Sequence, residues 1–201
     1  MSTSLLIMLV AAYLIGSMSG ARITAFLFNT SNPTEHGSKN PGATNMYRIA
    51  GFKAAIVTFL FDVLKGTIPL WGAYFLGFQP LELGLIAISC CIGHIFPIYH
   101  KFKGGKAVAT AFGVLLPIGL ELGLALALTW LITAYKTRYS SIASIVAVSL
   151  APLYVWLLKP KYTYAVIMLT ILIIIRHLPN IKRLIQGQEP KIDDKRDRTN
   201  I

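Results

Sequence analysis

The chain has 201 residues, of which 55% are hydrophobic and only 13% are charged, and it carries a formal net charge of +11. A soluble domain usually carries about 25% charged residues. The charges here gather in short clusters between apolar runs, so the composition excludes an ordinary soluble domain. The positive charge does not indicate a nucleic-acid partner, because Lys and Arg also gather in the cytoplasmic loops of membrane proteins.

The apolar runs predict an all-α integral membrane protein, because one crossing of a bilayer needs roughly 20 apolar residues. The first run has no positive segment before it, and its first charge is Arg22. This pattern predicts an uncleaved span with its N-terminus outside. No long polar stretch remains for a second domain, so we expect one membrane-embedded domain over residues 1–201, ending in a flexible basic tail. The runs cover residues 4–27, 53–76, 82–99, 107–136, 140–158 and 162–177, and the tail covers 190–201.

The fourth run is too long for one crossing. As a single helix, residues 107–136 would measure about 43 Å, against a hydrocarbon core of about 30 Å. Pro117 and Gly119 lie near its middle and favour a break there. We therefore expect two short helices of about 12 residues each, which makes seven spans in total.

The distribution of basic residues supports seven spans. With the N-terminus outside, only Lys159 and Lys161 fall in outside loops. This strong positive-inside bias predicts a periplasmic N-terminus and a cytoplasmic C-terminus, whereas six spans would place the basic tail outside. The inside loops and tail then hold Lys39, Arg48, Lys53, Lys101, Lys103, Lys106, Lys136, Arg138, Arg176, Lys182, Arg183, Lys191, Lys195, Arg196 and Arg198.

The charged residues Arg22, Asp62 and Lys65 lie within apolar runs. Asp62 and Lys65 are three residues apart and share a helix face. Charge inside a membrane is costly and usually functional. The alternative is a structural pair near the interface, with the Lys65 ammonium reaching toward water. For Arg22 we expect either a similar position at the interface or a side chain facing a basic site.

The first polar segment, residues 37–48, falls on the cytoplasmic side. Its glycines let the backbone approach a ligand, and its exposed N–H groups suit an anion. The guanidinium group of Arg48 can bind a phosphate through two parallel hydrogen bonds. The alternative is a plain polar loop. The polar side chains of this segment include Ser38, Asn40, Thr44, Asn45 and Arg48.

The second polar segment consists of Gly93 and His94 and then residues 102–110, in which the pair Gly104 and Gly105 stands between two lysines, directly before an apolar helix. Such a turn presents free N–H groups and a helix N-terminus, together with the Lys106 ammonium, to a phosphate. It is not a Walker A loop, because His100 and Ala107 replace the required Gly and Ser/Thr. The alternative is an ordinary cytoplasmic turn.

The third polar segment lies where the last run meets the cytoplasm. His177 can act as a base or a hydrogen-bond donor near neutral pH. Asn180 shares its face if the helix continues past Pro179, and Glu189 follows. The alternative is an interfacial helix whose Lys182 and neighbouring Arg contact anionic lipid.

Several other kinds of site are absent from the sequence. It has no Asp-rich metal cluster and no His-x-x-Glu-His motif, so we expect no metal and no cofactor. Cys90 and Cys91 lie side by side in an apolar run and are expected to be small core residues. No histidine is followed by Asp at the spacing of the His-x-x-x-x-Asp acyltransferases.

Taken together, the three segments and residues 61–66 resemble the PlsY family of acyl-phosphate:glycerol-3-phosphate acyltransferases over nearly the whole chain. The resemblance implies a seven-span enzyme of the bacterial inner membrane with its active site facing the cytoplasm. It implies acyl transfer from acyl phosphate, not acyl-CoA, to the 1-hydroxyl of glycerol 3-phosphate, giving lysophosphatidic acid and phosphate. The implied partners are the two substrates, membrane lipid and, transiently, the enzyme that makes acyl phosphate.

The resemblance also implies roles for individual residues. The implied catalytic residues are Ser38, Arg48, Lys106, His177 and Asn180. The implied substrate-binding residues are Asn40, Thr44, Asn45, Gly104, Gly105 and Glu189. Two positions depart from the family pattern, which has Gly where Lys39 and Ala107 stand. If the position of Ala107 requires a positive φ, we expect strain there.

The mechanism leaves alternatives open at this stage. The base is either His177 or a substrate phosphate, whose second pKa is near 6. Ser38 as an acylated nucleophile is less favoured, because no histidine stands beside it in sequence. A transporter of phosphate or a phosphate ester is the alternative function, although the motifs lie at span ends and not at mid-membrane. A nucleotide-dependent phosphotransferase would need metal-binding aspartates, and Asp62 is the one intramembrane Asp.

Overall fold

The computed structural model describes residues 2–194, and these form helices and loops without a strand. The prediction of an all-α protein is therefore confirmed for the described residues. Two single turns of 3-10 helix, Ile98–His100 and Pro160–Tyr162, lie at helix boundaries. The α-helices are α1 (Thr3–Gly16), α2 (Gly20–Leu27), α3 (Ala43–Phe75), α4 (Pro80–Ile95), α5 (Val108–Leu115), α6 (Leu120–Thr137), α7 (Ser140–Leu158) and α8 (Thr163–Ile185).

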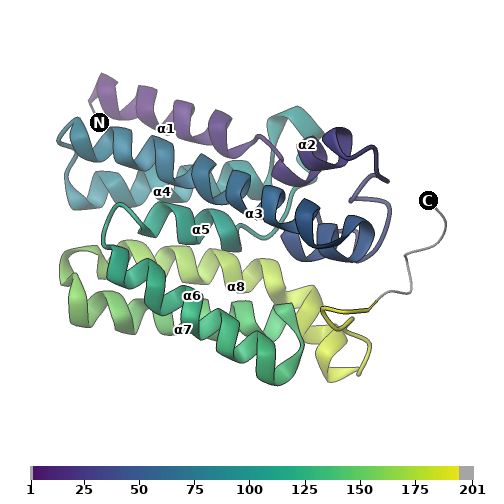
Figure 1. Cartoon of the computed structure of the whole chain (residues 1–201). Coiled ribbons are helices and arrows are strands. Elements are labelled where there is room, and N and C mark those ends of the chain that lie inside the picture. The colour runs from purple at the N-terminus through teal and green to yellow at the C-terminus, as the bar shows by residue number, and fades with distance from the viewer. Residues whose placement is uncertain (1, 195–201) are drawn as a thin grey trace.

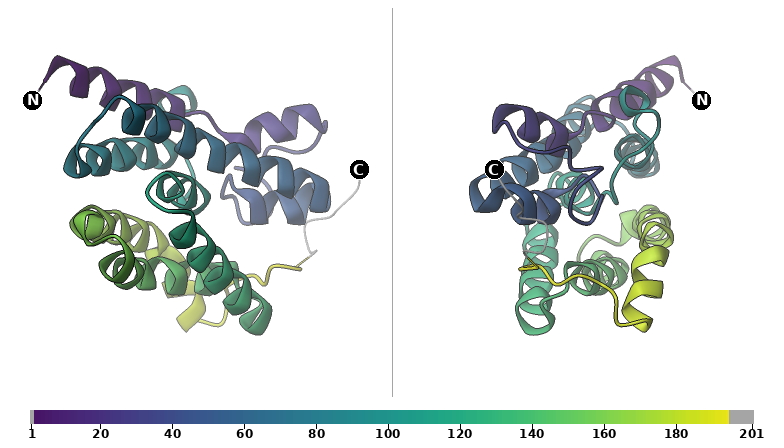
Figure 2. Two further views of the ribbon diagram at one scale, coloured as in Figure 1. Left: turned by 60° about the vertical axis from the view of Figure 1, so that its left-hand side comes forward. Right: turned by 90° about the vertical axis from the view of Figure 1, so that its right-hand side faces the viewer.

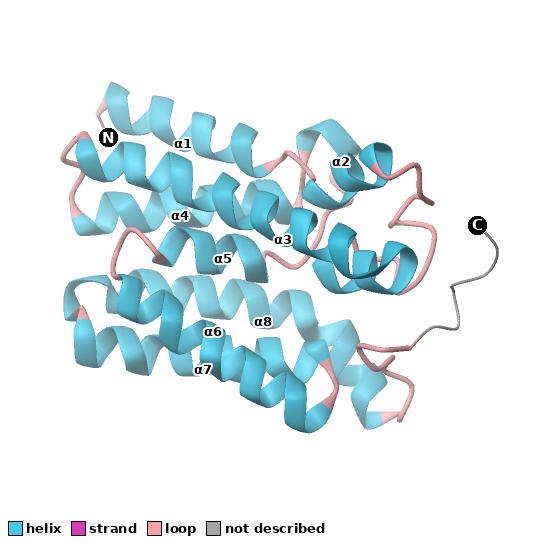
Figure 3. Cartoon of the chain, in the orientation of Figure 1, coloured by secondary structure: helices cyan, strands magenta, loops and turns pink. Residues whose placement is uncertain are grey.

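The helices form two groups with α5 between them (Figures 1 and 2). In the first group α1 packs on α4, and α3 contacts α1, α2 and α4. In the second group α7 packs between α6 and α8. Helix α5 lies against α3 and also contacts α4 and α6, so it joins the two groups (Figure 3).

The surface and the helix lengths are those of a protein in a lipid bilayer. Large apolar side chains such as Phe75, Tyr135 and Tyr164 are almost fully exposed on the outer faces of the helices, which water would not favour. The prediction of a chain with several membrane spans is confirmed at this level. The stretches long and apolar enough to cross are Thr3–Leu27, Ala43–Phe75, Pro80–His100, Ser140–Leu158 and Pro160–Ile185.

The predicted break in the fourth apolar run is present, but its two helices are unequal. Helix α5 has 8 residues and α6 has 18, in place of about 12 each. The reason is the place of the break: α5 begins at Val108 and already ends at Leu115, before the turn at residues 116–119, so most of the run is left for α6. At 1.5 Å per residue, α5 extends only about 12 Å. It is therefore shorter than the hydrocarbon core is thick, and neighbouring helices cover it on both sides.

Close packing keeps this short helix inside the protein. A Cβ on Gly113 of α5 would lie 2.0 Å from the Val63 carbonyl oxygen, and one on Gly66 of α3 would lie 2.5 Å from the Thr110 carbonyl oxygen. The two helices thus meet backbone to backbone, as small residues permit in membrane proteins. The free cysteines Cys90 and Cys91 are buried in the same core, as expected.

Helix α3 is divided near its start. Gly51 has φ 83° and ψ −169°, so the helix kinks there. The residues before the kink form a short helix ahead of the long apolar one, although the sequence suggested a polar loop there. This short helix carries Thr44, Asn45 and Arg48 to the same end of the bundle as the last turns of α8 (Figure 1).

Candidate active site

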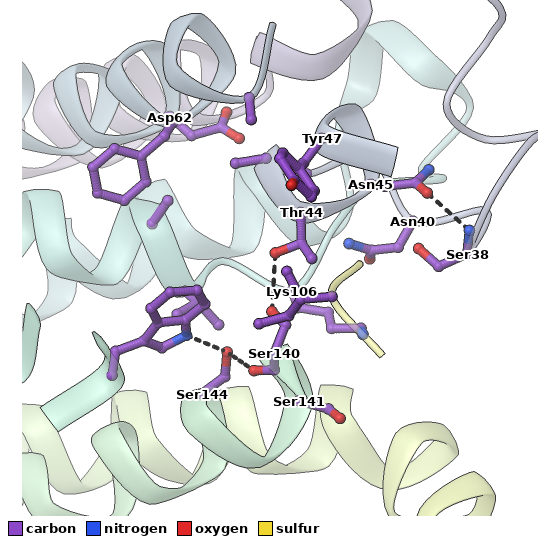
Figure 4. A pocket seen from close by; sticks show the side chains of 18 of the residues that line it. Ser38, Asn40, Thr44, Asn45, Tyr47, Asp62, Lys106, Ser140, Ser141 and Ser144 are labelled. Atoms are coloured by element: carbon purple, nitrogen blue, oxygen red, sulfur yellow. Dashed lines mark hydrogen bonds between the residues drawn. The ribbon is translucent and has the colours of Figure 1, made fainter. Parts of the chain in front are cut away.

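A cavity of about 570 Å³ lies between α3, α5, α6, α7 and α8. Figure 4 shows polar side chains at one side of it, with Thr44 and Ser140 joined by a hydrogen bond and Lys106 nearby. All three polar segments of the sequence contribute to its wall. Of the predicted site residues, those that line it are Ser38, Asn40, Thr44, Asn45, Arg48, Lys106, His177, Asn180 and Glu189.

The Asn45 amide holds the loop that carries Ser38. Its Oδ1 accepts the Ser38 N–H at 2.8 Å, and its Nδ2 donates to the carbonyls of Pro33 at 2.9 Å and His36 at 3.1 Å. Gly37 is required beside it, since it has φ 62° and a Cβ there would lie 2.1 Å from Oδ1. The sequence predicted that Asn45 binds substrate. In this structure the amide is engaged by the loop and positions the Ser38 backbone, and a contact of Asn45 with substrate stays a prediction.

Thr44 joins the first segment to α7. Its Oγ1 lies 2.9 Å from Oγ of Ser140 (Figure 4), so part of the hydrogen bonding expected for substrate is used between helices. Ser141 and Ser144 also line the cavity, and Ser141 is buried beside Glu189. Sequence reasoning missed these serines. The signal was present as a Ser pair at the start of an otherwise apolar span.

Arg48 is held by the end of the chain. Its Nε and Nη2 donate to the Lys191 carbonyl oxygen at 3.2 and 2.9 Å, and Nη2 also reaches the Pro190 carbonyl oxygen at 3.2 Å. The Ile192 N–H donates to the Arg138 carbonyl oxygen at 2.8 Å. Residues 187–194, here called the C-terminal strap, thus cross the cavity wall. The predicted flexible tail begins inside this strap, and its residues 195–201 lie outside the described part of the chain.

Glu189 ties the strap to α8. Its carboxylate accepts hydrogen bonds from Asn180 Nδ2 at 2.6 Å and Arg183 Nε at 2.8 Å. Burial alone would raise the pKa of Glu189, but these hydrogen bonds hold it below its usual range. Asn180 Oδ1 is buried, with no hydrogen-bond partner among residues 2–194. Glu189 therefore orients the Asn180 amide and leaves an acceptor at the cavity.

His177 and Asn180 lie on one buried face of α8, which continues through Pro179 as the sequence required. His177 Nδ1 lies 2.8 Å from the Ile173 carbonyl oxygen. A carbonyl oxygen only accepts, so Nδ1 carries the proton in the neutral ring. The other nitrogen, Nε2, then has a free lone pair. This tautomer, assigned from the hydrogen bond, equips His177 to accept a proton.

Gly104 and Gly105 are not among the residues that line the cavity, and their expected role in substrate binding stays a prediction. The Gly105 N–H donates to the His94 carbonyl at 3.1 Å, and its carbonyl accepts from Arg176 Nη2 at 3.2 Å. A Cβ on Gly104 would lie 2.0 Å from the His94 carbonyl oxygen. The absence of side chains at both glycines lets the loop pack directly against the end of α4.

The anion-binding groups lie one step further along the chain. Helix α5 begins at Val108 with no side-chain cap, and Lys106 to Ala109 line the cavity. The uncapped N–H groups and the helix dipole favour a negative charge there. Burial lowers the pKa of Lys106 to about 8, and nearby arginines act in the same direction, against the opposite effect of Glu189.

Both positions that depart from the family pattern are left-handed. Ala107 has φ 61° and Lys39 has φ 57°. This conformation suits glycine and costs other residues roughly 1–2 kcal/mol. The expected strain at Ala107 is therefore confirmed, and the backbone still forms the loop that opens α5.

The intramembrane charges lie in two places. Asp62 and Lys65 are buried and paired at 2.8 Å at the inner side of the cavity, so Lys65 does not reach toward water. Arg22 lies apart, beside a separate cavity of about 460 Å³, and its Nη2 donates to Thr34 Oγ1 at 3.3 Å. Arg22 therefore does not belong to the basic site.

Residues 6–187 match the family model described as glycerol-3-phosphate acyltransferase. A curated protein of that name from Pseudoalteromonas translucida is 57% identical over 190 residues, covering 94% of both chains. One from Vibrio cholerae (strain O395) is 51% identical over 188 residues, covering 94% of this chain and 90% of its own.

Solved structures agree with these relatives. The crystal structure of PlsY (YgiH), an integral membrane glycerol 3-phosphate acyltransferase, in its glycerol 3-phosphate form superposes with a TM-score of 0.87. It is 35% identical and covers 94% of this chain and 95% of its own. Its lysophosphatidic acid form gives a TM-score of 0.86. The chain described here therefore belongs to the glycerol-3-phosphate acyltransferase family.

Proposed function

We propose that this acyltransferase uses acyl phosphate as its donor and acylates the 1-hydroxyl of glycerol 3-phosphate, releasing lysophosphatidic acid and inorganic phosphate. The observation that carries the proposal is one cavity with two chemically distinct ends. One end gathers Arg48, Lys106, and the N-terminus of α5, which suit phosphate groups. The other end is apolar and suits an acyl chain; its lining includes Phe52, Ile56, Phe59, Phe112, Trp130 and Leu131.

The two solved states of PlsY support the substrate assignment, since that protein was captured with glycerol 3-phosphate and with lysophosphatidic acid. An acyl phosphate is a mixed anhydride and needs no further activation. The enzyme has to hold two phosphates, bring the hydroxyl within about 3 Å of the acyl carbon and stabilise the oxyanion. Lysine and arginine groups would hold the phosphates, and the acyl chain would enter from the lipid between helices.

The transfer itself forms one bond and breaks one. The 1-hydroxyl oxygen attacks the acyl carbon, and the bond from that carbon to the phosphate oxygen breaks. Asn180 Oδ1 is available to accept the hydrogen bond of a substrate hydroxyl, and the Ser38 hydroxyl is available as a donor. The phosphate leaves with the electron pair, and the hydroxyl proton passes to a base.

Two bases fit. His177 has its Nδ1–H held by Ile173, so its Nε2 lone pair is free to take the proton. A substrate phosphate is the alternative, because a phosphate monoester with a second pKa near 6 is a competent acceptor near neutral pH. The position of His177 on the cavity wall favours the histidine.

We also propose seven spans, a periplasmic N-terminus, a cytoplasmic C-terminus and a site that opens to the cytoplasm of a bacterial inner membrane. The support is the positive-inside bias of the loops, together with the separation of α5 from α6. The basic residues at this end of the bundle would also serve a soluble enzyme that delivers acyl phosphate.

The test is acyl transfer by purified protein with labelled glycerol 3-phosphate, comparing palmitoyl phosphate with palmitoyl-CoA and adding no metal. Lysophosphatidate formed from acyl phosphate alone supports the proposed donor. Product formed from palmitoyl-CoA alone would refute acyl phosphate as the donor. The glycerol-3-phosphate acyltransferase activity of the family would still stand. No product from either, in folded protein, would bring the phosphate-ester transporter forward, to be tested by uptake into vesicles.

A further inference from the structure

A buried cluster of three polar groups lies beside the cavity and has no part in the mechanism above. Asp62 and Lys65 of α3 and His94 of α4 are 1%, 3% and 8% exposed. Lys65 Nζ lies 2.8 Å from Asp62 Oδ1 and 2.7 Å from His94 Nδ1. Asp62 and His94 both line the cavity. Burying a charged pair in a membrane protein is costly, so such pairs are usually retained for function.

The hydrogen bonds of Lys65 determine which nitrogen of His94 carries its proton. An ammonium group has three N–H donors and no acceptor. The three are directed to Asp62 Oδ1, to His94 Nδ1 and, at 2.7 Å, to the Met18 carbonyl oxygen. Nδ1 must therefore accept, and the neutral ring carries its hydrogen on Nε2. His94 is thus a donor toward the cavity, whereas His177 is in the opposite tautomer.

The Nε2–H of His94 faces the loop that opens α5. A Cβ added to Gly105 would lie 2.2 Å from Nε2. Within residues 2–194, Nε2 makes no hydrogen bond, although Nδ1 and the backbone carbonyl are both engaged. Any side chain at Gly105 would cover this donor. The glycine, which does not itself touch the cavity, therefore leaves the imidazole edge open.

We propose that the Nε2–H of His94 donates a hydrogen bond to a substrate phosphate bound at the N-terminus of α5, and that Asp62 and Lys65 position it for that role. The inference rests on the proposed function, since it assigns one more donor to the same phosphate site. A neutral imidazole adds a directed donor without adding another positive charge to the lysine and arginines already there. The buried Asp62–Lys65 pair fixes the tautomer and the ring orientation.

The test compares His94→Gln, His94→Leu and, as a matched control outside the cavity, His100→Gln. The Gln amide can replace the Nε2–H donor, whereas Leu cannot. A hydrogen bond to a charged group contributes enough for a ten- to hundredfold change in affinity. We expect His94→Leu to raise the KM of one phosphate substrate by about that factor, with His94→Gln and His100→Gln near wild type.

Three kinetic arms identify the phosphate: KM for glycerol 3-phosphate, KM for acyl phosphate, and inhibition by inorganic phosphate. If both KM values and the inhibition by phosphate are unchanged in His94→Leu, the inference is overturned. The proposed function is tested separately, by the activity of the wild type. An equal loss of melting temperature and kcat in both His94 variants, with KM unchanged, would assign a purely structural role.

A measurement that leaves His94 unchanged covers the case in which the His94 variants do not fold. In the 15N NMR spectrum of histidine-labelled protein carrying His36→Gln and His100→Gln, in which His94 and His177 are the remaining imidazoles, we expect one ring with a protonated Nε2 and an unprotonated Nδ1. Addition of inorganic phosphate should shift its Nε2–H resonance. Two rings protonated on Nδ1, or an Nε2–H resonance that phosphate leaves in place, would refute the inference directly.

Discussion

The guanidinium group of Arg48 and the carbonyl oxygen of Lys191 are joined by two hydrogen bonds, of 3.2 Å from Nε and 2.9 Å from Nη2. A side chain that suits a phosphate is therefore engaged by the C-terminal strap, residues 187–194. A phosphate dianion attracts the guanidinium more strongly than a neutral carbonyl does. Substrate and strap thus compete for the same donors.

This competition predicts that phosphate loosens the strap. Saturating inorganic phosphate should accelerate tryptic cleavage after Lys191, measured by mass spectrometry over time. In Arg48→Lys, which cannot form the bidentate contact, we expect faster cleavage without phosphate and a smaller response to it. The control is the same digestion without phosphate, in a sulfate-free buffer of matched ionic strength. Protection of Lys191 by phosphate would show instead that the strap closes over the ligand.

Ala107 provides a prediction about stability. Because its φ is 61°, Ala107→Gly should relieve left-handed strain and stabilise the protein by up to about 1 kcal/mol. Ala109→Gly, two residues on in the first turn of α5, should instead destabilise it by about 0.5–1 kcal/mol. Melting temperatures in the same detergent test the pair. Destabilisation by both variants would show that Ala107 is not strained.

The sequence predicted the helical architecture because apolar runs and basic clusters are local signals. The break between α5 and α6 followed from Pro117 and Gly119. The lengths of α5 and α6 did not follow, because the break lies before the middle of the run and α5 is held by Gly66 and Gly113 packing against backbone. Such contacts depend on which helices become neighbours, and one sequence does not specify that.

The candidate site was also predicted only in part, in its lining residues but not in all of their contacts. Residue types located the cavity wall well, and nine predicted residues line it. They did not reveal that Asn45 and Gly105 position other groups, because those roles arise from contacts with residues 33–38 and with His94. The serines of α7 were missed, because a hydroxyl in an apolar span carries little information until its neighbours are known.

Lys106 predicts a pH dependence of substrate binding. Its pKa is lowered to about 8, so the free enzyme loses this positive charge as pH rises through about 8. Bound phosphate favours the charged form, so KM should rise above that pH while substrate-saturated kcat changes less. In Lys106→Arg the guanidinium stays charged, and the rise should disappear. A KM that is flat to pH 9 in wild type would contradict the assignment of Lys106 as a phosphate ligand.

His177 carries the prediction that separates the two bases. If its Nε2 takes the hydroxyl proton, His177→Ala should lower kcat by about 10²- to 10⁴-fold and remove the acidic limb of the kcat profile. His177→Asn should lose as much, because its amide N–H can replace the Nδ1–H that donates to the Ile173 carbonyl oxygen but cannot accept the proton. Steady-state rates from pH 5 to 9 with palmitoyl phosphate measure both effects. Substantial turnover with the wild-type pH profile in His177→Ala would transfer the role of base to a substrate phosphate.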